Sequence, residues 1–198
     1  MLFLLALVLA GCVSLTPQQQ EQVDDLQRFA DRTTLLYALP RLRISIQLPT
    51  NQNIGAVYRQ GNVLVNVRML GSPGLTKLIA HELGHYVLGH EPASTISSQS
   101  QWQRAQEQRE LDANAKAVEI LMRAKGMTQS EAVATLVEAL HRSQRAVDRG
   151  APITPGHLAP AAELADLLSR FPDARQLRRA GHRRRGRSPV WRTCSPPN

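Results

Sequence analysis

The residues with the clearest capacity for chemistry are His81, Glu82 and His85, which form a His-Glu-x-x-His pattern. Side chains four positions apart share one face of a helix, so both imidazoles can reach one zinc ion, which histidine nitrogens hold at about 2.0–2.1 Å. Glu82 points beside the metal, where a base can take a proton from zinc-bound water. The apolar residues 78–80 bury the helix and fix the ligands. The alternative is a buried helix with two solvent-facing histidines.

A catalytic zinc site needs a third protein ligand and an open fourth position. Metzincins carry a glycine seven residues and a histidine ten residues after the first histidine, where this chain has Leu88 and Glu91, so that class is excluded. Glu110, on a later helix, is the expected third ligand. Asn114 lies one turn further and is expected to accept a hydrogen bond from a ligand histidine and fix its tautomer. The alternative for Glu110 is a solvated charge on an amphipathic helix.

The run of residues 81–90, followed by Glu110 and an Ala-Asn pair ending at Asn114, resembles gluzincin peptidases of two related groups. The ImmA/IrrE-like group shares the Glu-x-x-Ala-Asn pattern. The HtpX/Ste24-like group, which includes periplasmic lipoprotein peptidases, shares the trailing His90 but usually has Asp where this chain has Asn114. The second resemblance gives His157 a role as transition-state donor or removable fourth ligand, the alternative being an ordinary loop histidine. His90 is expected to hydrogen-bond or cap the helix end.

This resemblance implies a hydrolase with one zinc ion (Zn2+) per chain that acts on a protein or peptide substrate. We therefore predict a zinc-dependent endopeptidase in which zinc-bound water is activated by Glu82, which then delivers the proton to the leaving amine. The alternative is a non-catalytic zinc-binding envelope lipoprotein that acts as a scaffold or interaction protein. Three protein ligands argue against it, because structural zinc sites are normally closed by four.

The elements that must position these residues are a small sheet and several helices. Strands are expected at 43–48, 55–58 and 63–69, the last two joined by a turn at 60–62. Five helices are expected. The first begins at Thr16–Pro17, the second covers 72–89 from a Ser72-Pro73 start, and the third covers 101–125 and ends at Gly126. The fourth follows a capping box at Thr128, and the fifth covers 161–170.

The predicted fold class is therefore α+β, with an antiparallel or mixed sheet of about three strands packed on the active-site helix and a mainly helical part behind it (zincin-like). The strand within 61–69 could pair with an extended substrate along an edge that carries Asn66 and Arg68. An ordinary sheet strand is the equal alternative.

The N-terminal residues indicate export. Residues 1–10 are nearly all apolar but too few to span a bilayer, and Leu9-Ala10-Gly11-Cys12 resembles the lipobox of bacterial lipoproteins. This resemblance implies a signal peptide at 1–11 and a lipidated Cys12 that anchors the chain to a membrane. Because Val13 is not Asp, the outer membrane facing the periplasm is the expected location. We expect a tether at 12–22, a zincin-like domain at 23–172 and a disordered tail at 173–198.

The net charge of +8 belongs to that tail, which carries eight arginines and no acidic residue from Arg175 onward, whereas the rest of the chain has sixteen basic and sixteen acidic residues. Such a tail can contact anionic lipid. Nucleic acid is not an expected partner, because no aromatic side chains are interleaved with the arginines to stack bases.

Overall fold

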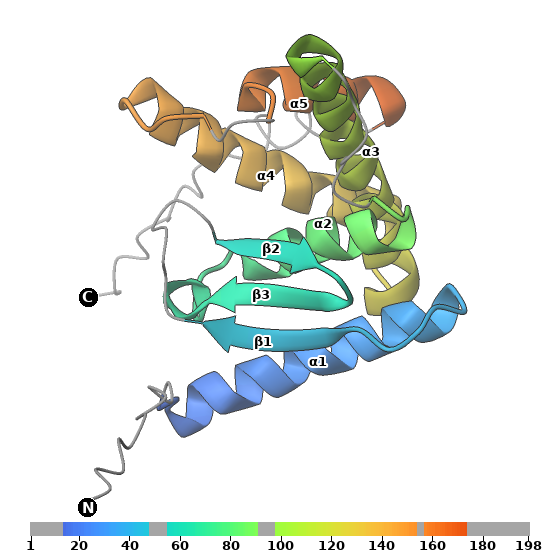
Figure 1. Ribbon diagram of the computed structural model, residues 1–198, viewed down its shortest axis with the longest axis vertical. Coiled ribbons are helices and arrows are strands. Elements are labelled where there is room, and N and C mark those ends of the chain that lie inside the picture. Colours follow the sequence, from blue (N-terminus) through green and yellow to red (C-terminus); the bar gives the residue numbers. More distant parts are fainter. Residues whose placement is uncertain (1–13, 48–54, 91–97, 154–156, 174–198) are drawn as a thin grey trace, which may run out of the picture.

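The computed structural model describes residues 14–47, 55–90, 98–153 and 157–173. The predicted signal peptide, Cys12 and the arginines of the tail lie outside these residues. Within them the fold is α+β, with three strands and five α-helices, which confirms the predicted class (Figure 1). No helix in the described segments combines the length and apolar character needed to cross a membrane.

The first helix, α1 (Pro17–Leu36), begins at the predicted Thr16–Pro17 signal. Thr16 Oγ1 accepts a hydrogen bond from the Gln19 amide at 3.2 Å, and Gln19 Oε1 accepts one from the Thr16 amide at 2.9 Å. Two otherwise unpaired backbone donors are thus satisfied reciprocally. Because the helix starts at Pro17, the segment 17–22 of the expected tether is helical. α1 lies along β1 and buries Leu26 and Phe29 (Figure 1).

The sheet is mixed, with strand order β1-β3-β2. β1 (Arg43–Gln47) pairs parallel with β3 (Asn62–Asn66), and β2 (Ala56–Arg59) pairs antiparallel with it. Gln60 and Gly61 form the turn between β2 and β3 with φ values of 43° and 78°, the positive-φ pair that suits the twist of a two-residue hairpin. β3 is therefore the central strand, and β2 is an edge strand.

The third strand is shorter than its sequence pattern predicts. Alternation of apolar residues continues to Met69, yet β3 ends at Asn66 and Val67–Met69 form a 3₁₀ turn. The cause is local: Asn66 Oδ1 accepts a hydrogen bond from the Arg68 amide at 3.0 Å and so caps the turn. The prediction that Val67 and Met69 extend the strand face was wrong.

Four helices follow the sheet: α2 (Leu75–Val87), α3 (Gln99–Lys125), α4 (Gln129–Asp148) and α5 (Pro160–Arg170). The predicted start of α2 was wrong, because the helix begins after Gly74 without a side-chain cap and Ser72 Oγ instead accepts a hydrogen bond from the Gly74 amide at 3.3 Å. The end of α3 at a left-handed Gly126 and the capping box at Thr128 before α4 are as predicted.

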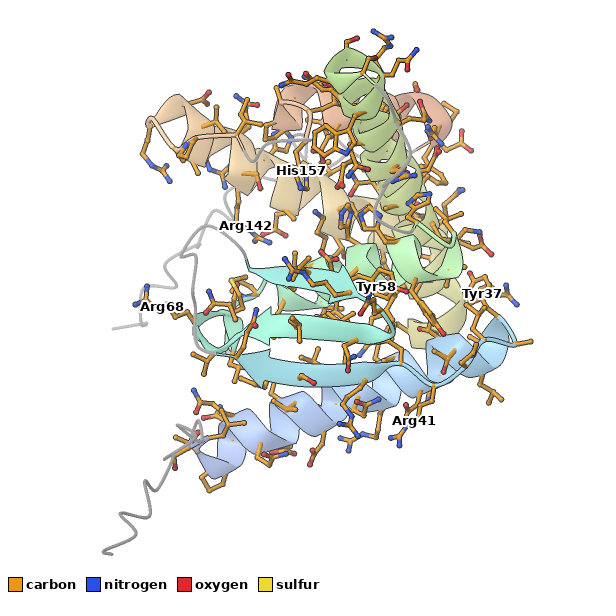
Figure 2. The ribbon with its side chains drawn as sticks, in the orientation of Figure 1. Tyr37, Arg41, Tyr58, Arg68, Arg142 and His157 are labelled. Atoms are coloured by element: carbon orange, nitrogen blue, oxygen red, sulfur yellow. The ribbon has the colours of Figure 1, made fainter. Side chains whose placement is uncertain are left out.

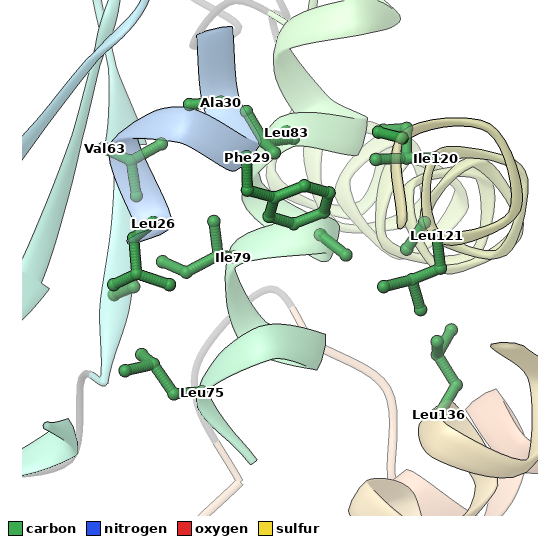
Figure 3. Close-up of a cluster of buried hydrophobic side chains, with 14 of the residues drawn as sticks. Leu26, Phe29, Ala30, Val63, Leu75, Ile79, Leu83, Ile120, Leu121 and Leu136 are labelled. Carbon is green, nitrogen blue, oxygen red and sulfur yellow. The ribbon is translucent and has the colours of Figure 1, made fainter. Parts of the chain in front are cut away.

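The core surrounds α2, which lies between the sheet side of the molecule and α3. Figure 3 shows Ile79 and Leu83 of α2 beside Phe29 of α1, with Ile120 of α3 on the other side, and all four are buried. Burial on both sides immobilises the helix that carries the His-Glu-x-x-His pattern, which is the requirement for holding ligands in fixed positions.

Candidate metal centre

His81 and His85 lie one turn apart on α2 and face the same point. Their Nε2 atoms are 3.1 Å apart, and the rings are nearly perpendicular at 85°. Glu110 approaches from α3, with Oε2 at 3.0 Å from His81 Nε2 and Oε1 at 3.5 Å from His85 Nε2. The structure thus brings together the three residues expected as ligands, and their donor atoms all lie within 4.8 Å of one another.

These separations fit one tetrahedral zinc ion. Two atoms that each bind zinc at about 2.0–2.1 Å in tetrahedral geometry lie roughly 3.3–3.4 Å apart. The two imidazole nitrogens are 3.1 Å apart, and Glu110 approaches His81 through Oε2 at 3.0 Å and His85 through Oε1 at 3.5 Å, so each of these separations is close to that value. Two imidazoles and one carboxylate are also the donor set of gluzincin-type catalytic sites, with a fourth position for solvent or substrate.

The close approach of α2 and α3 explains how Glu110 reaches the histidines. A Cβ placed on Gly84 would lie 2.7 Å from the Ala113 carbonyl oxygen and 3.2 Å from its Cα, which is too near for any side chain. Gly84 therefore allows backbone contact between the helices, and Ala113 is one turn past Glu110. The glycine inside the ligand pattern and the alanine after Glu110 together set the spacing of the site.

Asn114 and Glu163 form a hydrogen-bonded chain behind His81. Asn114 Oδ1 lies 3.0 Å from His81 Nδ1, and Asn114 Nδ2 donates to Glu163 Oε2 at 2.9 Å. An ionised carboxylate only accepts, so Glu163 fixes the Asn114 amide with its oxygen toward His81. His81 then donates from Nδ1 and leaves the Nε2 lone pair for a metal. Glu163 was not predicted, because an acidic residue in the first turn of a short helix is ordinary in sequence.

Glu82 is held by the edge strand. Its Oε2 accepts a hydrogen bond from the backbone amide of Tyr58 on β2 at 2.7 Å. The Tyr58 ring packs against Tyr86 at 5.4 Å between centroids, and the Tyr86 hydroxyl donates to the Pro40 carbonyl at 2.9 Å. Tyr86 packing therefore helps to fix β2 against α2 beside the site.

Burial dominates the electrostatics of the centre. It lowers the pKa of His81 to about 4 against the opposing hydrogen bond of Glu110, which keeps the imidazole neutral as metal binding requires. Burial also raises the pKa of Glu82 to about 7, against the opposing charge of His85. The pKa of Glu163 is raised by burial too, although the hydrogen bond from Asn114 opposes the shift.

Two further histidines border the centre. His157 Nδ1, from the segment before α5, lies 3.2 Å from Glu110 Oε2 and is partly exposed. His90 Nδ1 lies 3.0 Å from His85 Nδ1, so one of the two nitrogens donates to the other. The contact of His90 agrees with the expected hydrogen-bonding role. His157 is near enough to meet a group bound at the metal position.

A cavity of about 630 Å³ opens over the candidate ligands. Its walls come from β2, α2, α3 around Glu110, the second half of α4, and the segment that leads into the start of α5, with Tyr58 and His157 on opposite sides (Figure 2). β2, not β3, borders this cavity. The expected substrate-pairing edge at Asn66 and Arg68 was therefore wrong, because β3 is paired on both sides and has no free edge.

The fold and site define a small α+β protein with a two-histidine, one-glutamate centre of the kind found in zinc peptidases. Residues 41–135, just under half of the chain, match the family model of the IrrE N-terminal-like domain, a peptidase family. The matched segment contains His81, Glu82, His85, Glu110 and Asn114 and supports a metallopeptidase-like relationship. No curated protein and no solved structure matches the chain.

Proposed function

We propose that this protein is a zinc-dependent endopeptidase held at the bacterial envelope. The observation that carries the proposal is the convergence of His81, His85 and Glu110, whose donor atoms lie within 4.8 Å of one another and border a cavity of about 630 Å³. Glu82 lines the same cavity. A metal site that opens into a cavity suits catalysis better than structural support, for which zinc sites are closed by four protein ligands.

Zinc in this site supplies Lewis-acid activation of water and of the scissile carbonyl. Glu82 has one carboxylate oxygen engaged by the Tyr58 amide, so we assign the other oxygen to take the proton from the attacking water. As the carbon–nitrogen bond breaks, the same carboxyl delivers that proton to the leaving amine. The net change is addition of one water across the peptide bond.

The remaining residues orient this machinery. The Glu163–Asn114 chain sets the tautomer of His81, and Gly84 lets Glu110 approach. His157, next to Glu110, is placed to donate a hydrogen bond to the oxyanion that forms on the substrate carbonyl. We expect its removal to lower turnover without removing the metal.

The competing proposal, a non-catalytic zinc lipoprotein, predicts metal without cleavage. Both proposals are tested with purified full-length protein by measuring zinc content and digestion of casein and of a peptide library. We expect about one zinc per chain and cleavage by the wild type. Glu82→Gln should retain zinc and lose roughly 10²–10⁴-fold in rate. Glu110→Ala should lose zinc. Glu107→Ala, one turn earlier on α3, is the matched control and should keep both zinc and the cleavage rate.

The outcomes distinguish the peptidase from the non-catalytic scaffold. Stoichiometric zinc without cleavage of any substrate by the wild type would favour the scaffold. Cleavage by Glu82→Gln at the wild-type rate would show that another group is the base. Absence of zinc from the wild type would refute both proposals.

We also propose that lipidated Cys12 anchors the protein to the outer membrane on its periplasmic side, with contacts between the Arg-rich tail and anionic lipid as a second attachment. Support comes from the lipobox resemblance alone. Cys12→Ser should move the protein out of the membrane fraction after a high-salt wash, which screens the tail, whereas Cys194→Ser should not. An unmodified Cys12 in the mass spectrum of membrane-associated protein would contradict the anchor.

A further inference from the structure

Lys77 is the one charged group of α2 that the proposed mechanism leaves unused. It lies one turn before His81, is half-buried, and lines the same cavity as the candidate ligands. In the part of the chain that the structure describes, its ammonium forms no hydrogen bond or close ion pair. No buried side-chain nitrogen or oxygen of the described residues lacks a hydrogen-bond partner, so this unbonded ammonium is not sealed from solvent and is open to a group that enters the cavity.

Carboxylates near Lys77 attract it at a distance but are bound elsewhere. Glu163, Glu82 and Glu110 all act on its charge. Yet Glu163 accepts from Asn114, Glu82 accepts from the Tyr58 amide, and Glu110 contacts the two imidazoles. A lysine present only to balance these charges would form an ion pair with one of them. Lys77 instead keeps its donors available to the cavity.

The relative direction of β2 and α2 shows which end of β2 lies beside Lys77. A Cβ on Gly55, just before β2, would touch Leu78 at 2.8 Å, whereas Tyr58 bonds Glu82 and packs on Tyr86. The strand and the helix therefore run in the same direction (Figure 1). The start of β2 lies beside the Lys77 end of the cavity, and the end of β2 lies beside the far end of α2.

Among the described residues no strand pairs with the outer side of β2, so an extended peptide can be added there. The Asn66 amide donates to the Gly55 carbonyl at 2.9 Å, and hydrogen-bonded pairs alternate along an antiparallel ladder. The main-chain groups of Ala56 and Tyr58 therefore point away from β3; the Tyr58 amide already donates to Glu82, so an incoming peptide would pair at Ala56. A peptide paired antiparallel with this edge runs opposite to β2. Its C-terminal part is then directed toward Gly55 and Lys77.

We propose that Lys77 forms a subsite for a carboxylate carried by one of the first two residues after the scissile bond. This inference rests on the proposed peptidase function. Four residues of helix separate Lys77 from His81 by about 6 Å along the axis, which corresponds to about two residues of extended peptide. The carboxylate comes from one of two sources: the side chain of Asp or Glu, or the terminal carboxylate of a substrate cleaved two residues from its end.

Four peptides of one sequence distinguish these sources. Each peptide ends at the second residue after the scissile bond. That last residue is Glu or Gln, and its terminal carboxylate is either free or amidated. For zinc-loaded full-length protein we expect kcat/KM for at least one carboxylate-bearing peptide to exceed that for the Gln-amide peptide by about tenfold, the value of one charge-assisted hydrogen bond. A higher kcat/KM for the Glu-amide peptide identifies the side-chain carboxylate as the source, and a higher kcat/KM for the Gln peptide with a free terminus identifies the terminal carboxylate.

The variants test the residue. Lys77→Met, which keeps the apolar stem, should bring this kcat/KM ratio close to one, and Lys77→Glu should invert it. Lys125→Met, on the outer surface of α3, is the matched control and should leave the ratio as in the wild type. Zinc content and thermal unfolding are measured for each variant, so that a loss of metal or fold is recognised.

Binding gives a readout that does not need turnover. By calorimetry, Gly-Glu should bind the zinc-loaded wild type more tightly than the amidated dipeptide Gly-Gln, and Lys77→Met should remove the difference. Cleavage of all four peptides with equal kcat/KM, or an advantage that Lys77→Met retains, would overturn the subsite and leave the peptidase standing. No cleavage of any peptide by the wild type would count against the peptidase, and equal binding of the two dipeptides would then overturn the subsite as well.

Discussion

The contact between Gly84 and Ala113 allows a prediction that needs no assumption about catalysis. In Gly84→Ala the new Cβ would meet the Ala113 carbonyl oxygen at 2.7 Å, and ordinary contact begins at 3.4 Å, so the α3 backbone must withdraw by at least about 0.7 Å. Overpacking costs about 1–3 kcal/mol, and the higher helix propensity of alanine returns up to about 1 kcal/mol. We expect a net loss of roughly 1–2 kcal/mol in the free energy of unfolding.

The same displacement should reach the metal centre. Glu110 is one turn before Ala113 on α3, and zinc tolerates deviations of about 0.2 Å in ligand distance. We expect zinc affinity to fall about 10–100-fold, measured by competition with a chromogenic chelator, beside urea denaturation of metal-free protein. Gly74→Ala is the control, since its Cβ would meet nothing closer than Arg142 Nη2 at 3.4 Å. Wild-type stability and zinc affinity in Gly84→Ala would refute the claim that this contact sets the site.

Two further predictions follow from side-chain hydrogen bonds. Glu163→Leu removes the acceptor that orients Asn114 and should weaken zinc binding about 10–100-fold by chelator competition, whereas Glu163→Gln keeps an acceptor and should lose less; equal affinities of the two variants would exclude the orienting role. Burial, with the bond to Glu119, raises the pKa of Tyr37 to about 12. Because this folded-state pKa lies above the unfolded value of about 10, its stabilisation is complete below pH 10 and is lost as pH rises through 12. Tyr37→Phe should flatten that part of the stability curve in denaturant titrations, and an unchanged slope would contradict the assignment.

The features that sequence could predict are those that local chemistry determines. The spacing of His81 and His85 places both on one helix face whatever surrounds them, and zinc chemistry then requires a third ligand, which led to Glu110. Both capping boxes were predictable for the same reason, because Thr16 and Thr128 bond residues three positions away.

The features that sequence could not predict depend on pairing between distant segments. Strand order is non-local, so the alternating pattern of residues 63–69 gave no sign that β3 would lie between β1 and β2 and that β2 would be an edge of the described sheet. Asn66 ended the strand by a side-chain hydrogen bond that competes with the ladder. Glu163 and Lys77 resemble ordinary helical charges until the fold brings α5 and α2 to the same cavity.

The residues that match the peptidase family and the residues that follow them contribute different sides of the cavity, and the second side is the one expected to determine selectivity. The segment that matches the peptidase family ends at residue 135 and includes His81, His85 and Glu110 as well as the candidate base Glu82. The opposite wall of the cavity comes from later residues, among them Leu140, Val147, His157 and Glu163. A substrate of the proposed peptidase must therefore lie between two surfaces. One is formed by α2 and β2, which belong to the matched segment, and the other by α4, α5 and the segment between them. For the proposed peptidase, substitutions at Leu140 or Val147 should change which peptides are cleaved and leave the metal ligands in place, because α2 and α3 hold those ligands through their own close contact. Glu163 is the exception, since it orients Asn114 behind His81.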